Sequence, residues 1–195
     1  MKIGFTLIEM LVVISIFTIM TGVVLANLPN FRERTALQLV AQKMSLTIRE
    51  AQVYGVGVKS SGVNVFPSHG IIFGPVASNK KSYVLFADDY PPGPPIGNNK
   101  YDSGNNELVT KYDLTGTVEI QHLDTCLSSL SCVSQDSAGL NIVFDRPKTE
   151  ANFTDSSGVV IPSTSYVNIT VASSRSGETR IIQVWNTGQI SVKTP

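Results

Sequence analysis

The sequence predicts an α+β protein in which a long N-terminal α-helix packs on an antiparallel β-sheet globular domain. Two patterns predict this fold class. An apolar N-terminal run continues into an amphipathic segment with helical spacing, and the second half of the chain alternates short apolar segments with turn residues. We therefore divide the 195 residues into a leader (1–4), an apolar helix (5–28), an amphipathic helix (29–55) and a β-rich domain (56–195).

The apolar helix expected at residues 5–28 is long enough to cross a bilayer, which takes about 20 apolar residues. Its only charged residue is Glu9. One interpretation is a signal peptide cleaved after Ala26, although the apolar run is longer than that of an ordinary signal peptide. A second interpretation is a plain membrane anchor. Neither explains Glu9, because an unpaired carboxylate at membrane depth costs at least ~2.5 kcal/mol.

The string GFTLIE at residues 4–9 offers a third interpretation. It resembles the processing motif of type IV prepilins and type II secretion pseudopilins. The resemblance implies that prepilin peptidase, a membrane-embedded aspartic peptidase, cuts between Gly4 and Phe5 on the cytoplasmic side, and that the new amine of Phe5 is methylated. It also implies that Glu9 neutralises the Phe5 amine of a neighbouring subunit, so that a charge pair replaces two unpaired charges.

The amphipathic helix has two apolar faces. Residues at i, i+3 and i+4 spacing form the first face, which comprises Leu37, Val40, Ala41, Met44, Ile48 and Ala51. Leu39, Leu46 and Val53 recur every seventh residue and fall on the opposite face. They are either scattered surface residues, which are common, or a second contact face directed at neighbouring helices in a filament.

The helix is expected to be long but locally weakened. Gly22 and Pro29 disfavour helix at their positions, and the pair Gly55 and Gly57 is expected to end the helix after Tyr54. An unbroken helix from residue 5 to 54 would be roughly 75 Å long. This length, carried by a small domain, resembles the lollipop shape of type IV pilins.

Strands are expected through the rest of the chain, at Gly70–Phe73, Ser82–Ala87, Glu107–Asp113, Val118–His122, Leu140–Phe144, Tyr166–Ala172, Arg180–Trp185 and Gln189–Val192. The last two form a hairpin that turns at residues 186–188. Tyr90–Asn99 contains four prolines and is expected to be a stiff loop.

The two cysteines, Cys126 and Cys132, are separated by five residues in what we expect to be a serine-rich loop. Three states are open to them: a zinc site, a local disulfide and two free thiols. Zinc needs about four ligands, and only His69 and His122 could add nitrogen ligands. An extracytoplasmic domain would favour the disulfide.

No catalytic motif is present in the sequence, so we expect no enzymatic activity. One stretch, residues 88–107, gathers Asp, Asn and Glu side chains between two expected strands. Calcium prefers such oxygen ligands, although the spacing of an EF-hand is absent. Two interpretations stay open here: a calcium loop and a polar, turn-forming loop. No other cofactor is expected.

The β-rich half resembles the H-type minor pseudopilins of type II secretion and related minor pilins, through the strings NIVFDRP (141–147) and IQVWNTGQI (182–190). The resemblances together imply a structural subunit, a minor pilin or pseudopilin, of a type IV pilus or type II secretion pseudopilus. The implied partners are other pilin or pseudopilin subunits, prepilin peptidase, and an inner-membrane assembly platform with its ATPase.

The implied location is the inner membrane, crossed once with the globular domain outside the cytoplasm, and afterwards a surface or periplasmic filament. The charges balance, with 15 basic and 15 acidic residues, so a nucleic-acid partner is not expected. Two alternatives remain: a tip subunit that binds a surface, secreted cargo or DNA, and an anchored envelope enzyme, for which the sequence offers no site.

Overall fold

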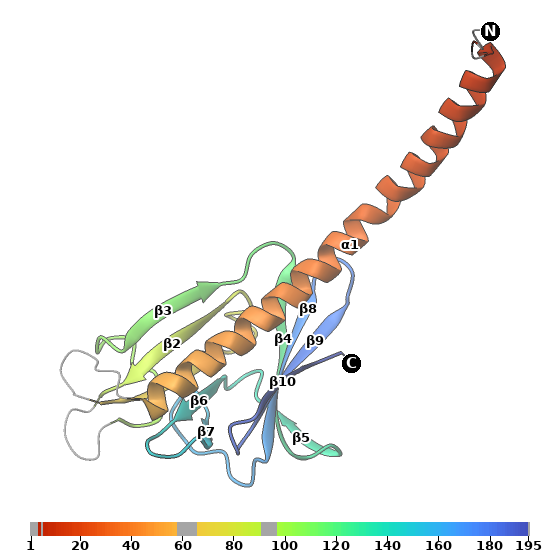
Figure 1. Ribbon diagram of the computed structural model, residues 1–195. Helices are drawn as coiled ribbons and strands as arrows, with labels where there is room; N and C mark the ends of the chain where they lie inside the picture. The colour runs from red at the N-terminus through yellow and green to blue at the C-terminus, as the bar shows by residue number, and fades with distance from the viewer. Residues whose placement is uncertain (1–3, 5, 58–65, 91–96, 195) are drawn as a thin grey trace.

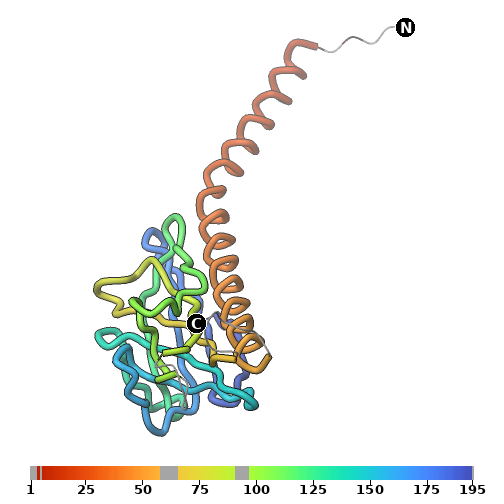
Figure 2. The backbone as a smooth tube through the Cα atoms, turned by 90° about the vertical axis from the view of Figure 1, so that its left-hand side faces the viewer, coloured from red at the N-terminus to blue at the C-terminus, as the bar shows by residue number. Residues whose placement is uncertain are grey.

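The computed structural model describes residues 4, 6–57, 66–90 and 97–194. Helix α1 (Leu7–Val56) is 50 residues long, which corresponds to about 75 Å. Its first half projects freely from the domain, and its second half lies across the domain (Figure 1). Figure 2 shows from a second direction that only the second half touches the β-rich part.

The helix is continuous through both positions that were expected to weaken it. Pro29 lies inside α1, and the assignment is helical at Gly22 as well. A proline inside a helix removes one backbone donor, and its ring crowds the carbonyl four residues earlier, which favours a kink. Figure 2 shows a gentle curve along the free half.

The helix ends two residues later than the sequence predicted. Val56 is its last residue, and the backbone N–H of Gly57 donates to the carbonyl oxygen of Val53 at 2.8 Å. Gly57 therefore caps the helix, as expected. Gly55 does not end it: this glycine is helical and buried, and its role is one of close packing.

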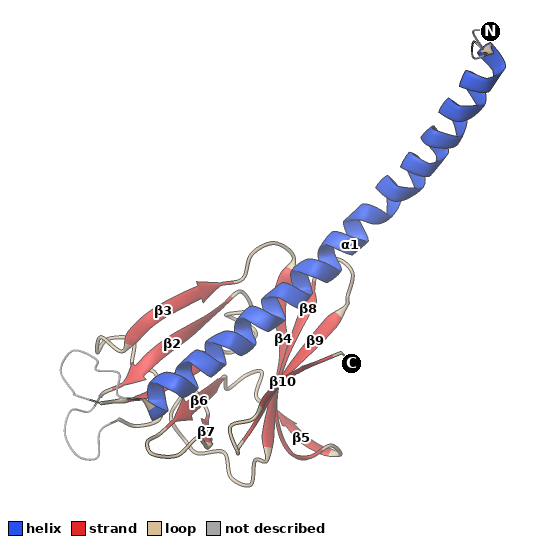
Figure 3. Cartoon of the chain, viewed as in Figure 1, coloured by secondary structure: helices blue, strands red, loops and turns tan. Residues whose placement is uncertain are grey.

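Among the described residues, ten strands follow the helix and form two antiparallel sheets (Figure 3). They are β1 (Ser68–Phe73), β2 (Ser82–Asp88), β3 (Leu108–Asp113), β4 (Val118–Ser128), β5 (Ser131–Ser134), β6 (Leu140–Phe144), β7 (Ala151–Thr154), β8 (Tyr166–Ser173), β9 (Thr179–Trp185) and β10 (Ile190–Lys193). The first sheet has the order β3-β2-β1-β6-β7, and the second has the order β10-β9-β8-β4-β5. The α+β fold class is confirmed, with two sheets in place of one.

All eight predicted strands are present, and two strands were missed. β7 is short, and β5 is exposed along its whole length, so neither gives the alternation of a half-buried strand. β4 also continues to Ser128, well past the predicted end at His122. The expected loop around Cys126 and Cys132 was therefore wrong: the two cysteines face each other in the β4–β5 hairpin.

One core joins the helix to both sheets. The inner face of α1 contributes Leu37, Ala41, Met44, Ile48 and Ala51, each fully buried. Ile71, Leu85 and Ile142 of the first sheet, together with Ile169 and Val184 of the second, complete the same cluster. The inner apolar face predicted for the helix is confirmed, with Val40 partly buried at its margin.

Candidate functional site

The N-terminus of α1 is held by a capping interaction within the GFTLIE string. Thr6 is the N-cap, in an extended conformation, and its hydroxyl oxygen accepts the backbone N–H of Glu9 at 3.3 Å. A Thr followed three residues later by Glu is the sequence of a capping box, so this cap has a signal in the sequence itself. Glu9 therefore has a local position in the first helical turn, where a carboxylate complements the helix dipole.

Of the expected cleavage junction, the structure describes Gly4. Gly4 is exposed, and a Cβ placed on it would meet no atom within 4 Å. Packing within one chain therefore does not require a glycine at this position. Phe5 lies outside the described residues. Cleavage between Gly4 and Phe5 stays a prediction.

The free half of α1 presents apolar side chains on all sides. Residues 7–28 contain no buried side chain, and their large apolar residues include Leu7 and Phe17, which are 84% and 70% exposed. α1 is the one helix among the described residues that is long and apolar enough to cross a membrane. A helix that is apolar all round needs an apolar environment, which this chain alone does not supply.

The docked half of α1 keeps a second apolar face outward. Leu39, Leu46 and Val53 are 60%, 69% and 59% exposed, although they lie on the part of the helix that packs on the domain. Exposed polar and charged residues, Gln42, Lys43 and Arg49, lie between these three positions, so the docked half carries single apolar residues at every seventh position. Exposed apolar surface of the extent seen on the free half marks an interaction site.

Polar contacts fix the docked half of α1 on the domain. At its end, the side-chain amide of Gln52 donates to the carbonyl oxygens of Thr149 and Gly188, both at 3.0 Å. At its start, Glu33 and Arg34 contact the turn between β8 and β9 through ion pairs with Arg175 (3.5 Å) and Glu178 (2.7 Å). The helix direction relative to the domain is thereby set at both ends.

A comparison with protein families finds the prokaryotic N-terminal methylation motif at residues 2–25. The chain carries a prepilin-type N-terminus on a type IV pilin-like fold. A comparison with curated protein sequences finds no match, and a comparison with solved structures finds none either.

The matched motif covers the start of the chain alone, residues 2–25. It is typical of type IV pilins and pseudopilins, and it implies assembly with other pilins and processing by prepilin peptidase. Such proteins are structural subunits. The matched residues include the candidates Gly4, Phe5 and Glu9. The motif ends before the docked half of α1, so the pilin-like shape of the remainder comes from the structure.

The cysteines of this pilin-like chain form a cross-strand link near the tip of the β4–β5 hairpin. The Sγ atoms of Cys126 and Cys132 are 2.03 Å apart, as a disulfide, and the two residues are paired in register. Cys126 is fully buried, whereas Leu130 at the tip is 97% exposed. Of the three states left open by the sequence, the geometry is that of the disulfide.

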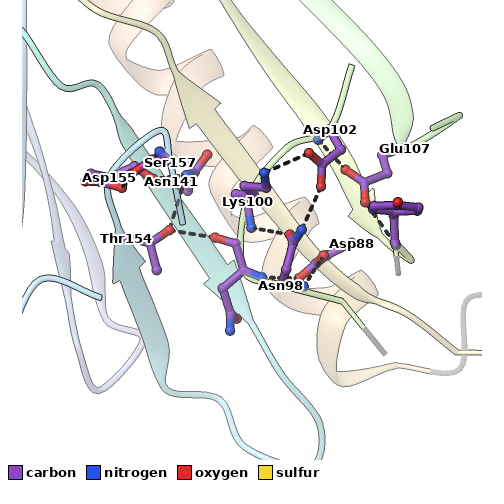
Figure 4. A network of polar contacts seen from close by, with 11 residues as sticks. Asp88, Asn98, Lys100, Asp102, Glu107, Asn141, Thr154, Asp155 and Ser157 are labelled. Atoms are coloured by element: carbon purple, nitrogen blue, oxygen red, sulfur yellow. Dashed lines mark hydrogen bonds and ion pairs between the residues drawn. The ribbon is translucent and has the colours of Figure 1, made fainter. Parts of the chain in front are cut away.

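The 88–107 segment is organised by two buried carboxylates (Figure 4). Asp88, at the end of β2, accepts the backbone N–H groups of Asn98 and Asn99 at 2.9 and 2.7 Å. Glu107, just before β3, accepts those of Tyr90 and Asp102 at 3.0 and 2.6 Å. Each carboxylate therefore accepts hydrogen bonds from two backbone N–H groups of this segment and holds the backbone in place there.

Side chains add a second set of contacts within this segment. Asp102 accepts a hydrogen bond from the amide of Asn98 at 2.7 Å and pairs with Lys100 at 3.0 Å. Thr154 on β7 donates to the carbonyl oxygen of Asn99 at 2.6 Å, which attaches the segment to the sheet edge (Figure 4). The four prolines of the predicted stiff loop at positions 91, 92, 94 and 95 lie outside the described residues.

Burial dominates the electrostatics of the two carboxylates. It raises the pKa of Asp88 to about 6 and that of Glu107 to about 7, and the backbone hydrogen bonds oppose this rise only in part. Across the described residues, no group of three or more His, Cys, Asp or Glu side chains is placed to hold a metal ion. The contacts favour a polar loop clamp, and calcium binding here stays a prediction.

Proposed function

We propose that this chain is a minor pilin or pseudopilin: a filament subunit that is cut at Gly4–Phe5, resides in the inner membrane and is then built into a helical filament. The assembly machinery would be an inner-membrane platform with its ATPase. The minor role follows from the resemblance of the second half to H-type pseudopilins. The string at 141–147 covers most of β6 and the turn after it. The string at 182–190 covers the second half of β9 and the turn into β10.

The observation that carries the proposal is the apolar surface of α1, which is exposed all round the first half of the helix. Its first half needs a bilayer or a bundle of helices around it, and its second half adds Leu39, Leu46 and Val53 on the outer side. A bilayer hydrocarbon core about 30 Å thick covers only the first half of a helix about 75 Å long. A filament in which neighbouring helices pack side by side would cover both halves.

Such packing is expected to build an open fibre. Each subunit would offer the outer face of its helix to the next one, and a contact between two different surfaces repeats without closing unless the rotation brings it round. The globular domain would then lie on the outside of the fibre, because the exposed apolar surface of the free half of the helix would face the neighbouring helices.

The test is to shear filaments from cells that express the tagged chain and to quantify each subunit by mass spectrometry. The chain should be present in far fewer copies than the main subunit, with its N-terminus at Phe5 and one added methyl group. Absence from the filament fraction would contradict a filament subunit. Copy numbers equal to those of the main subunit would contradict the minor role, and a start at Met1 would contradict processing.

One observation favours a second candidate function, that of a tip subunit which binds a partner. The β4–β5 hairpin exposes three large apolar side chains close together in sequence: Leu127 (57%), Leu130 (97%) and Val133 (62%). Exposed apolar clusters of this kind often mark contact sites. A Leu130→Asp variant that enters filaments normally but abolishes adhesion or cargo secretion would favour this function over a purely structural one.

A further inference from the structure

The place where α1 leaves the domain forms a small cavity with an apolar side and a basic side. Leu25, Leu28 and Pro29 of the helix line one side. Arg32 and Glu33, one turn further along, and Arg175, from the turn between β8 and β9, line the other. The cavity has a volume of about 350 Å³, which is at the lower end of the range for small-ligand sites, roughly 300–1,000 Å³.

The cavity lies at the depth where lipid headgroups would surround the helix. Residues 7–28 span about 32 Å along the axis, slightly more than the hydrocarbon core of a bilayer, which is about 30 Å thick. Arg32 follows about 6 Å later along the axis. Figure 1 shows the β8–β9 turn beside α1 at the side of the domain from which the free half of the helix projects.

The charges around the cavity favour an anion. Arg32 is exposed and forms no ion pair with any described residue. Arg175 contacts Glu33 at 3.5 Å, and its side chain is 71% exposed, so it retains donors for another group. The side chain of Glu33 is only 12% exposed, and its second carboxylate oxygen accepts a hydrogen bond from the hydroxyl of Ser173 at 3.4 Å. The single acid therefore positions Arg175 while leaving excess positive charge at the rim.

We propose that this junction binds the phosphate of an anionic phospholipid while the chain resides in the membrane. Arg32 and Arg175 would hold the headgroup phosphate, since guanidinium groups match phosphate oxygens well. The start of an acyl chain would lie along Leu25 and Leu28. The proposal rests on the membrane-anchored precursor of the proposed function. It adds a lipid preference that would fix the height of the domain above the bilayer before assembly.

The experiment uses the full-length chain in a mild non-ionic detergent, titrated with phosphatidylglycerol or phosphatidylcholine and observed by native mass spectrometry. The wild-type chain should retain phosphatidylglycerol in preference to phosphatidylcholine. Arg32→Gln and Arg175→Gln should each lower the retention of phosphatidylglycerol about fivefold, which is the effect of one basic side chain near an anionic lipid surface, with phosphatidylcholine unchanged. Glu33→Gln should raise phosphatidylglycerol retention, because it releases Arg175.

Lys148→Gln is the matched control. Its side chain is also 71% exposed and also pairs weakly with an acid, Glu150 at 3.8 Å, but it lies outside the cavity. This variant should bind lipid as the wild type does. Equal retention of the two lipids by the wild type, or an equal loss in Lys148→Gln, would overturn the proposal. Lipid retention is measured before assembly, so it can fail while filament incorporation succeeds, and the reverse can also occur.

Discussion

Gly55, in the last turn of α1, lies directly against Phe144 at the end of β6. A Cβ placed on Gly55 would collide with the carbonyl oxygen of Phe144 and would lie 2.9 Å from its Cβ atom. Phe144 is itself fully buried and belongs to the shared core. The end of the helix and the first sheet therefore approach each other as closely as a glycine permits.

Gly55→Ala is expected to destabilise the fold by about 2 kcal/mol, as overpacking does in a filled core. Alanine favours a helix over glycine by up to about 1 kcal/mol, so an increase in stability would be expected if Gly55 served only as a helix stop. Urea unfolding of the full-length chain in detergent measures the difference. The single tryptophan, Trp185, packs on Tyr166 at 4.7 Å and gives the fluorescence signal.

Gly104→Ala is the control for this substitution. A Cβ on Gly104 would meet nothing within 4 Å, so the stability of this variant should stay within about 0.5 kcal/mol of the wild type. A Gly55→Ala chain as stable as the Gly104→Ala chain would show that the close contact with Phe144 is not a packing constraint.

The role of Gly55 illustrates what the sequence could and could not predict. Local signals placed the helix, its inner face and eight of the strands, because each follows from spacing along one segment. A glycine near a helix end carries the same local signal whether it stops the helix or packs against a distant strand. Only the packing of α1 against β6 distinguishes these two roles of the glycine, and that packing brings together residues far apart in sequence.

The same limit explains the other differences. Composition shows the oxygen atoms of Asp88 and Glu107 but not the backbone N–H groups that bond to them in the fold, so the sequence alone left both a calcium loop and a polar loop open. The contact between Arg175 and Glu33 joins residues that are distant in sequence, and no local pattern could have indicated it. By contrast, the Thr6 cap of the helix has a local signal, because the spacing from Thr6 to Glu9 is that of a capping box.

The link between Cys126 and Cys132 should be present in the native protein. Cleavage by chymotrypsin after Leu127 and Leu130 would separate the two cysteines, so peptide mapping without a reductant should show two peptides joined by a disulfide. Ready labelling of both thiols in the folded chain would contradict the link. Because the closed loop is short, replacing both cysteines by alanine should cost about 2 kcal/mol in the entropy model. Reductant should lower the stability of the wild type but not of that variant.

The raised pKa values of the two buried carboxylates predict that the free energy of unfolding declines as the pH rises. The pKa of Asp88 in the folded chain is about 6 and that of Glu107 about 7, both above the ordinary values of 3.8 and 4.5. The folded state therefore holds these protons more tightly than the unfolded chain does. Their contribution to stability is complete below about pH 4 and is lost as the pH rises through 6 and 7, on the order of 3 kcal/mol for each group.

Unfolding of an Asp88→Asn, Glu107→Gln double variant measures this effect. The amides cannot titrate, so the decline between pH 4 and pH 8 should become smaller than in the wild type, whatever the stability of the variant at low pH. Asp113→Asn serves as the control, because this carboxylate is 69% exposed. An unchanged slope in the double variant would show that the two buried acids do not govern the pH dependence.

Glu9 combines two possible roles, and the structure allows them to be separated. Its backbone N–H is bonded to Thr6 in the helix cap, whereas its carboxylate is the group proposed to meet the Phe5 amine of a neighbouring subunit. Glutamine also occurs at this position of a capping box. Glu9→Gln therefore keeps the local cap and removes only the charge.

Filament incorporation should be lost in Glu9→Gln and in Glu9→Ala alike, with cleavage after Gly4 and the fold of the β-rich domain unchanged. A subunit without the carboxylate would leave the amine of its neighbour unpaired in an apolar bundle, which is strongly unfavourable. Residence in the membrane should be undiminished, because the substitution removes a charge from an apolar span. The measurement is the amount of each variant in sheared filaments and in membranes.

Thr6→Ala is the matched control for the cap. It removes the hydroxyl that accepts the N–H of Glu9, at a cost of about 1 kcal/mol to the helix end, and leaves the carboxylate in place. We expect this variant to enter filaments. If Thr6→Ala were excluded while Glu9→Gln entered normally, the geometry of the cap would be what assembly requires, and the proposed charge pair between subunits would be wrong.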